Sequence, residues 1–279
     1  MLKVAKSGFF TSIQDKGRFG YRHMGVPVSG AMDQQAASLA NALLENSKTD
    51  AVMEITMSGP VLEFLSPTYI AITGANLSPS LNGEAIDMHS VHKVLEGDTL
   101  TFGRHIEGLR GYLGIKGGLL TETVLNSRSF YKPVTPSARL NDGVEISYQE
   151  VTSFNPKISH IITKKIDKVS LLKVSKGPEY DILSKNEQTE LFGKPFTIAK
   201  ENNRMAYQLE ETLDTHTHSM LTSATLPGTV QITPAGKIII LMRDGQTTGG
   251  YPRILQLSDD AINVLAQKTF GDTISFQID

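Results

Sequence analysis

The sequence predicts a mainly β protein built from two tandem modules of ~100 residues each. Short runs rich in Val, Ile, Phe and Thr recur along the chain, and Gly, Pro, Asn and Asp separate them. Several short strands with turn residues between them are typical of a barrel or a sandwich. The second observation is an internal repeat, whose anchors occur in the same order and with nearly the same spacing in both halves.

The repeat rests on four pairs of short segments. LKVAKSG (2–8) matches LKVSKG (172–177), GPVLEF (59–64) matches GTVQIT (228–233), IAIT (70–73) matches IIIL (238–241), and GDTLTF (97–102) matches GDTISF (271–276). Any one pair is weak evidence, but four pairs in order indicate repeated architecture. We therefore predict a first barrel module over 1–103, bridging strands and a linker over 104–169, and a second barrel module over 170–279.

A few short helices accompany the strands. Residues 33–46 place Ala and Leu on one face, and Ser29 or Asp33 can cap the start. A second helix is predicted over 258–267 with Ser258 as its N-cap. Further short helices are predicted over 180–192 and 204–211.

Composition excludes several classes of protein. The net charge of -2 gives no basic field for nucleic acid. The absence of cysteine removes disulfides, cysteine–zinc sites and a cysteine nucleophile. The first residues lack the pattern of a secretory signal, and no apolar run reaches the roughly 20 residues of a membrane helix. We expect a cytoplasmic protein with no nucleic-acid or membrane partner.

The glycine-dense segment over 12–33 is the first candidate functional loop. It carries Asp15, Arg18 and Tyr21 among glycines that indicate demanding backbone angles. A loop on a rigid scaffold can deliver such side chains to a cleft. The alternative is an ordered connection into the 33–46 helix.

A second candidate loop follows the apolar run 238–242 in KIIILMRDGQTTGGYPRI (237–254). Gln246, Thr247 and Thr248 offer hydrogen-bond donors and acceptors, and Gly249 and Gly250 allow close approach of a ligand. The alternative is a β-turn with a glycine pair at a barrel corner. The candidate substrate-binding residues are Tyr21, Gln246, Thr247, Thr248, Gly249, Gly250 and Tyr251.

Common cofactor motifs are missing from the sequence. It has no phosphate-binding P-loop, no dinucleotide-binding glycine motif and no G-x-S-x-G nucleophile elbow. In THTH (215–218), His216 and His218 can begin a metal site, but no third ligand is evident nearby and a surface loop is the alternative. We expect no metal and no cofactor bound by this chain.

Longer motifs resemble a known family. SIQDKGRFGYRHMGVPVSGAMD, LANALLEN, MEITMSGPVLEF, IAITGANL, RGYLGIKGG and LPGTVQITPAGKIIILMRDGQTTGGYPRI are similar to the allophanate hydrolase subunit 2 family, which also includes the 5-oxoprolinase C subunits (PxpC), the KipA-type proteins and the biotin-dependent carboxyltransferase A/B subdomains. The resemblance covers nearly the whole chain. It implies two cyclophilin-like β-barrels and a heteromeric complex.

The resemblance also implies an activity. We expect a component, inactive alone, of an ATP-dependent 5-oxoprolinase that opens 5-oxoproline to glutamate. Its partners would be the 5-oxoprolinase B subunit, of the allophanate hydrolase subunit 1/KipI type, and the 5-oxoprolinase A subunit. The sequence has no biotin-acceptor A-M-K-M segment and no ATP motif, so ATP would come through the complex. Two alternatives stay open: a carboxyltransferase component of a urea carboxylase, with biotin supplied in trans, or a KipA-type regulatory module that binds a KipI-type kinase inhibitor.

Residue roles follow as hypotheses. Arg18 and Arg204 are the candidate catalytic cations that orient a carboxylate or carboxyphosphate-like anion. Asp15 is a candidate base or orients Arg18. The 246–248 side chains would hold the lactam, helped by the backbone N–H groups of Gly249 and Gly250. A third interpretation assigns these loops only to bracing the barrels.

Overall fold

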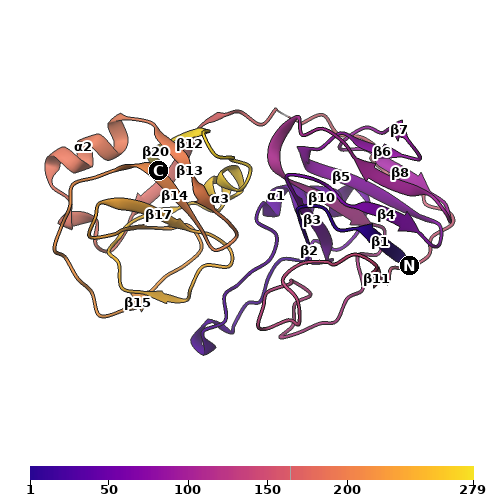
Figure 1. Ribbon diagram of the computed structural model, residues 1–279, viewed down its shortest axis with the longest axis horizontal. Helices are drawn as coiled ribbons and strands as arrows, with labels where there is room; N and C mark the ends of the chain where they lie inside the picture. Colours follow the sequence, from indigo (N-terminus) through magenta and orange to yellow (C-terminus); the bar gives the residue numbers. More distant parts are fainter. Residues whose placement is uncertain (164) are drawn as a thin grey trace. The chain divides into compact units, whose positions relative to one another are not determined.

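The computed structural model describes residues 1–163 and 165–279 and confirms a mainly β fold. The chain forms two compact units (Figure 1). Unit 1 comprises Met1–Arg18 and Ser29–Ile166, and unit 2 comprises Phe19–Val28 and Asp167–Asp279. The internal repeat predicts module boundaries at residues 103 and 169. These boundaries remain a prediction of which segments of the chain were duplicated.

Unit 1 contains two antiparallel sheets. The six-stranded sheet has the order β11 (Glu145–Ile146), β1 (Leu2–Lys6), β4 (Val61–Phe64), β9 (Thr99–Phe102), β6 (Pro79–Leu81) and β7 (Glu84–Ala85). The five-stranded sheet has the order β2 (Phe10–Gln14), β3 (Val52–Thr56), β10 (Glu107–Ile115), β5 (Thr68–Asn76) and β8 (Val91–Val94). The central strand β10 comes from the segment 104–169, which therefore contributes to this sheet.

The core of unit 1 lies between these two sheets. Leu2 and Phe64 of the six-stranded sheet belong to one hydrophobic cluster with Ile13, Ile72 and Leu113 of the five-stranded sheet. All five side chains are at most 1% exposed. Unit 1 is thus a two-layer sandwich, in which alternate residues of β1, β3, β4 and β5 face the shared core.

Helix α1 (Gln34–Leu43) packs against the five-stranded sheet. The Asp33 carboxylate caps it by accepting a hydrogen bond from the Ala36 N–H, so Asp33 and not Ser29 is the cap. The Thr73 hydroxyl of β5 donates to the Ala36 carbonyl at 2.7 Å. Because Gly114 of β10 has no side chain, Ala40 of the helix can approach that strand closely.

A buried polar network supports the start of this helix. The Glu54 carboxylate accepts hydrogen bonds from the Met32 N–H at 2.7 Å and from the Tyr112 hydroxyl at 2.9 Å, and the same hydroxyl accepts the Asp33 N–H. Glu54 and Tyr112 are fully buried, and the Arg110 guanidinium lies 4.0 Å from Glu54. Burial, together with the Glu54 charge, raises the pKa of Tyr112 well above its usual value, which keeps its hydroxyl a donor.

Unit 2 contains a closed seven-stranded barrel. Its order is β12 (Val169–Lys176), β19 (Arg253–Leu257), β16 (Thr229–Ile232), β17 (Lys237–Leu241), β14 (Ala206–Thr212), β13 (Phe196–Asn202) and β20 (Thr273–Ile278). The parallel pairing of β12 with β20 closes the ring. A separate two-stranded ribbon joins β15 (Ser223–Ala224) to β18 (Thr248–Gly249).

The helices of unit 2 partly match expectation. Helix α3 (Asp259–Ala266) has Ser258 as its N-cap, as predicted. The 180–192 prediction corresponds to the 3₁₀ helix η2 (Tyr180–Ile182) and to α2 (Lys185–Gly193). The helix predicted over 204–211 is wrong, because this stretch is strand β14, which pairs with β13 and β17 and buries Tyr207 and Leu209.

The repeated segments all fall on strands. The pairs are β1 with β12, β4 with β16, β5 with β17 and β9 with β20. Their hydrogen-bonded neighbours differ, since β12 pairs directly with β20 whereas β1 and β9 each pair with β4. The repeat therefore describes strand sequences more closely than it describes a shared pairing scheme.

Candidate functional site

The polar segment 246–251 leaves the barrel after β17 with its backbone fixed and its side chains accessible. Gln246 and Thr248 are exposed, and Thr247 is half-buried. The Thr225 N–H donates to the Thr247 carbonyl at 3.0 Å, and the Thr225 hydroxyl donates to the Gln246 carbonyl. Because the backbone carbonyls hold the segment in place, the side chains of 246–248 are available for a ligand.

The 3₁₀ helix η1 (Arg22–Met24) is part of the same unit and reaches the same segment. The Arg22 guanidinium donates through Nη2 to the carbonyls of Thr225 and Thr247. Tyr21 is the N-cap of η1 and is half-buried. Unit 2 thus brings Arg22, the neighbour of the predicted Tyr21, into contact with the predicted segment 246–251, although more than 200 residues separate them in sequence.

Arg204 anchors the turn that leads into this segment. Its guanidinium makes a two-point ion pair with Asp244, with Nε–Oδ2 at 2.8 Å and Nη2–Oδ1 at 3.1 Å. The Asp244 N–H donates to the Arg204 carbonyl at 2.9 Å. The cation that was predicted to orient a substrate anion therefore already holds a protein carboxylate.

Asp15 and Arg18 lie in unit 1, where both bind a distant loop. The Asp15 carboxylate accepts hydrogen bonds from the hydroxyls of Ser127 and Ser129 at 2.7 and 2.6 Å, and from two backbone N–H groups. Arg18 is fully buried and donates to the carbonyls of Val124 and Ser129. Segment 15–18 is therefore held against segment 124–129 by two groups. The Asp15 carboxylate accepts four hydrogen bonds, and the buried Arg18 guanidinium donates to two carbonyls.

The predicted site residues thus divide between the units. Tyr21, Arg204 and the segment 246–251 share unit 2, whereas Asp15 and Arg18 share unit 1. Neither Arg22 nor Thr225, which connect the unit 2 group, was among the predicted site residues. Arg22 follows Tyr21 in the glycine-dense segment, and that position was its only signal in the sequence.

Comparison with known proteins assigns the family. The chain matches the family described as "Carboxyltransferase domain, subdomain A and B" over residues 24–278. The chain belongs to this family.

Named relatives within the carboxyltransferase family include single components and parts of larger enzymes. The chain is 31% identical to the 5-oxoprolinase C subunit of Escherichia coli, covering 99% of this chain and 90% of that protein. It is 31% identical to the same component of Haemophilus influenzae, covering 95% and 87%. The crystal structure of the Kluyveromyces lactis urea carboxylase matches with a TM-score of 0.88 and 26% identity over 99% of this chain, which spans only 27% of that larger chain.

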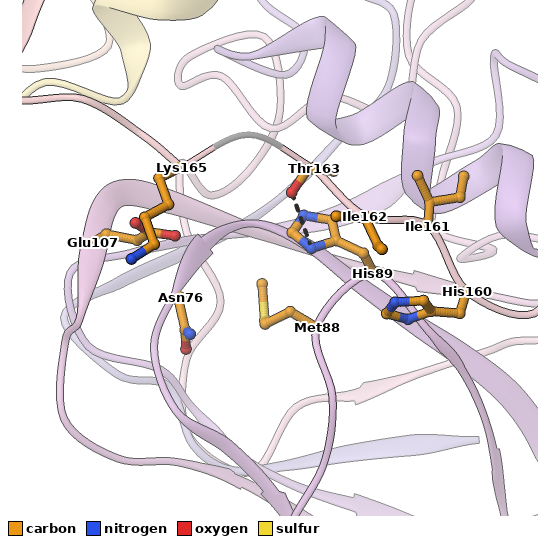
Figure 2. Close-up of a pocket in the computed structure, with 9 residues that line it drawn as sticks. All are labelled: Asn76, Met88, His89, Glu107, His160, Ile161, Ile162, Thr163 and Lys165. Atoms are coloured by element: carbon orange, nitrogen blue, oxygen red, sulfur yellow. Dashed lines mark hydrogen bonds between the residues drawn. The ribbon is translucent and has the colours of Figure 1, made fainter.

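Unit 1 of this carboxyltransferase-family chain also has an open pocket of about 210 Å³ (Figure 2). It is lined by Asn76, Met88, His89, Glu107, His160, Ile161, Ile162, Thr163 and Lys165. The segment that contains His160 adds to the edge of the five-stranded sheet, because Ser90 and His160 form an antiparallel bridge and the Ser90 hydroxyl lies 2.6 Å from His160 Nδ1. His89 has a left-handed backbone, with φ of 57°.

The His89 side chain of this pocket makes the stability of the fold depend on pH. Burial and the nearby His160 lower the pKa of His89, and Glu107 opposes them. Lys165 is the other charged group on the lining. The folded state disfavours the protonated imidazole of His89. The contribution of this imidazole to the free energy of unfolding is therefore fully present above its usual pKa of 6.5. It is lost as the pH falls below 6.5 toward the lowered pKa of the folded state.

Replacement of His89 by asparagine should remove this acid sensitivity. Asparagine tolerates the left-handed backbone, so the fold is retained. We expect the free energy of urea unfolding to fall less in His89→Asn than in the parent chain when the pH is lowered from about 7.5 to about 5.5. The exposed His23→Asn is the matched control. The same loss in both variants would contradict the assignment to His89.

The described residues were compared with the requirements of a metal site and of a membrane-spanning helix. In residues 1–163 and 165–279, no group of three or more His, Asp or Glu side chains has the arrangement of a metal site. The rings of His216 and His218 lie 5.5 Å apart. None of the helices in these residues has the length and apolar character to cross a membrane.

Proposed function

We propose that this chain is the C subunit of an ATP-dependent 5-oxoprolinase and works with the B and A subunits of that enzyme. The observation that carries the proposal is the end-to-end match to the Escherichia coli 5-oxoprolinase C subunit, which leaves only about a tenth of that protein uncovered. The sequence contains no ATP-binding motif. ATP chemistry therefore belongs to another component of the complex, and this chain contributes substrate recognition.

The substrate-binding role falls on unit 2. Gln246, Thr247 and Thr248 would hydrogen-bond the lactam, with help from Tyr21 and the backbone of Gly249 and Gly250. A rigid backbone with accessible amide and hydroxyl groups suits a small polar ring. Tyr251, which is 42% exposed, would border the ring on its apolar side.

Asp15, Arg18 and Arg204 enter the proposal as positioning residues. Their charged groups already bind protein atoms. A base or an anion clamp has to exchange such bonds before it can act on a substrate. Arg204 would contribute to turnover by holding the turn before segment 246–251. Asp15 and Arg18 would contribute by holding segment 15–18, from which the chain continues into η1.

Reconstitution tests the proposed function. The chain would be coexpressed with candidate B and A subunits, and glutamate release from 5-oxoproline would be measured with and without ATP. We expect release only with all three chains and ATP. An intact complex that ignores 5-oxoproline but carboxylates urea with a separate biotin carrier would overturn the proposal.

A carboxyltransferase role in urea carboxylation is the second candidate. It is favoured by the structural match to the Kluyveromyces lactis urea carboxylase, whose TM-score is 0.88. In this case biotin would be carried on another polypeptide, because the sequence has no A-M-K-M segment. The urea arm of the same reconstitution separates the two candidates.

The two neighbouring glycines of the segment provide a matched prediction. A Cβ at Gly249 would lie 2.9 Å from Gln231 Nε2, which donates to the Tyr251 carbonyl, whereas a Cβ at Gly250 would meet nothing closer than 3.4 Å. We expect Gly249→Ala to lower kcat/KM of the reconstituted complex by about 10-fold to 100-fold, because Gln231, which would have to move, is buried and holds the Tyr251 carbonyl. Gly250→Ala keeps the backbone N–H that would bind the substrate, and it should stay within about twofold. Equal activities of the two variants would exclude the segment from the site.

A further inference from the structure

The arginines of unit 2 differ in their counter-charges. Three have a carboxylate within 4.0 Å: Arg204 with Asp244, Arg243 with Asp259 and Arg253 with Glu179. Arg22 has no such partner among the described residues of either unit. Within residues 1–163 and 165–279, the positive charge of Arg22 therefore has no carboxylate beside it.

The surroundings of Arg22 make this absence significant. Its Nη2 donates to the carbonyls of Thr225 and Thr247, while its Nη1 is buried and has no hydrogen-bond partner in the part of the chain that the structure describes. Burial lowers the pKa of Arg22. A desolvated guanidinium with an open donor is unfavourable until an acceptor reaches it.

Arg253 provides an internal comparison at the same ribbon. It donates Nη1 to the Ala224 carbonyl at 2.6 Å, one residue from the carbonyl that Arg22 uses. Its Nε and Nη2 donate to the Glu179 carboxylate, and these hydrogen bonds raise the pKa of Arg253. Two arginines thus hold adjacent carbonyls of one segment, and only one brings its own carboxylate.

We propose that Arg22 binds the carboxylate of the substrate. The proposal rests on the proposed function: 5-oxoproline carries a carboxylate beside its lactam, and Arg22 lies against the segment that would hold the lactam. A small ion suits this donor better than a macromolecular surface, because Nη1 is closed to solvent. Entry of the carboxylate then requires η1 to shift.

This assignment makes Arg22 a specificity residue. Planar guanidinium groups recognise carboxylates through paired hydrogen bonds, and a polar donor built for a charged group rejects ligands that lack it. Urea and 2-pyrrolidinone have the amide but no carboxylate. The site should therefore prefer 5-oxoproline over 2-pyrrolidinone, and the preference should weaken at high salt.

Binding to the isolated 279-residue chain tests the proposal. Titration calorimetry would compare 5-oxoproline, 2-pyrrolidinone and acetate with the parent chain, Arg22→Gln and Arg22→Lys. We expect Arg22→Gln to weaken 5-oxoproline binding by about 10-fold to 100-fold and to weaken 2-pyrrolidinone binding much less, since 2-pyrrolidinone loses only the support of the Thr225 and Thr247 carbonyls. Arg22→Lys should lie between, since it keeps the charge and loses the fork. His23→Gln, on the exposed neighbour in η1, is the matched control.

The outcomes separate the two proposals. In an active complex, Arg22→Gln should raise KM for 5-oxoproline with little change in kcat. Unchanged binding and KM, or an equal loss for 5-oxoproline and 2-pyrrolidinone, would overturn the role of Arg22 and leave the proposed function intact. An inactive complex combined with Arg22-dependent binding of acetate would overturn the proposed function and leave the carboxylate site. No carboxylate binding and no turnover would overturn both.

Discussion

Replacement of Glu54 by alanine is expected to lower the free energy of unfolding by about 3–5 kcal/mol. Glu54 is fully buried, and its carboxylate accepts hydrogen bonds from Met32 and Tyr112. It also lies 4.0 Å from the buried Arg110 guanidinium. The substitution removes a charge partner and an acceptor from groups that cannot reach water.

Urea unfolding followed by circular dichroism measures this loss, since the chain has no tryptophan for fluorescence. The matched control is Glu63→Ala, which removes an ion pair with Lys3 on partly exposed side chains at 3.0 Å. That change should cost less than about 1 kcal/mol. If the two variants lose similar stability, the buried network is not what holds the start of α1.

The second large loss of stability is expected when the ion pair between Arg204 and Asp244 is broken. Arg204→Ala should destabilise unit 2 by about 3 kcal/mol, because it leaves the Asp244 carboxylate, 12% exposed, without its two-point partner. The turnover of a reconstituted complex should fall with it, since the pair fixes the turn that precedes segment 246–251.

A double-mutant cycle identifies the pair as the cause. Arg204→Ala, Asp244→Ala and the double variant would be unfolded in urea under the same conditions. We expect the double variant to lose about 1–3 kcal/mol less than the two single losses added together. Strictly additive losses would show that the two residues act independently.

Local chemistry made several features predictable. Ser258 and Asp33 cap α3 and α1, because a side-chain oxygen before an apolar helical pattern satisfies the first N–H groups. The mainly β class followed from short strand patterns for the same local reason. Strand β14 shows the limit, because its conformation is set by pairing with β13 and β17 and not by its own propensity.

The candidate site depended on information that local sequence does not carry. Arg18 and Arg22 lie four residues apart in one glycine-dense segment, yet Arg18 binds the carbonyls of Val124 and Ser129. Arg22 instead binds carbonyls more than 200 residues away. Since both arginines have the same local setting, only the tertiary partners distinguish their roles.

The membership of Phe19–Val28 in unit 2 affects how this protein can be divided. The chain passes between the units three times, at residues 18–19, 28–29 and 166–167. A single break after residue 166 would leave the second piece without Arg22 and leave the first with ten residues that belong elsewhere. The two units are therefore not two consecutive segments of the chain. Gene fission or shuffling at one junction would separate the Arg22 guanidinium from the Thr225 and Thr247 carbonyls that it binds.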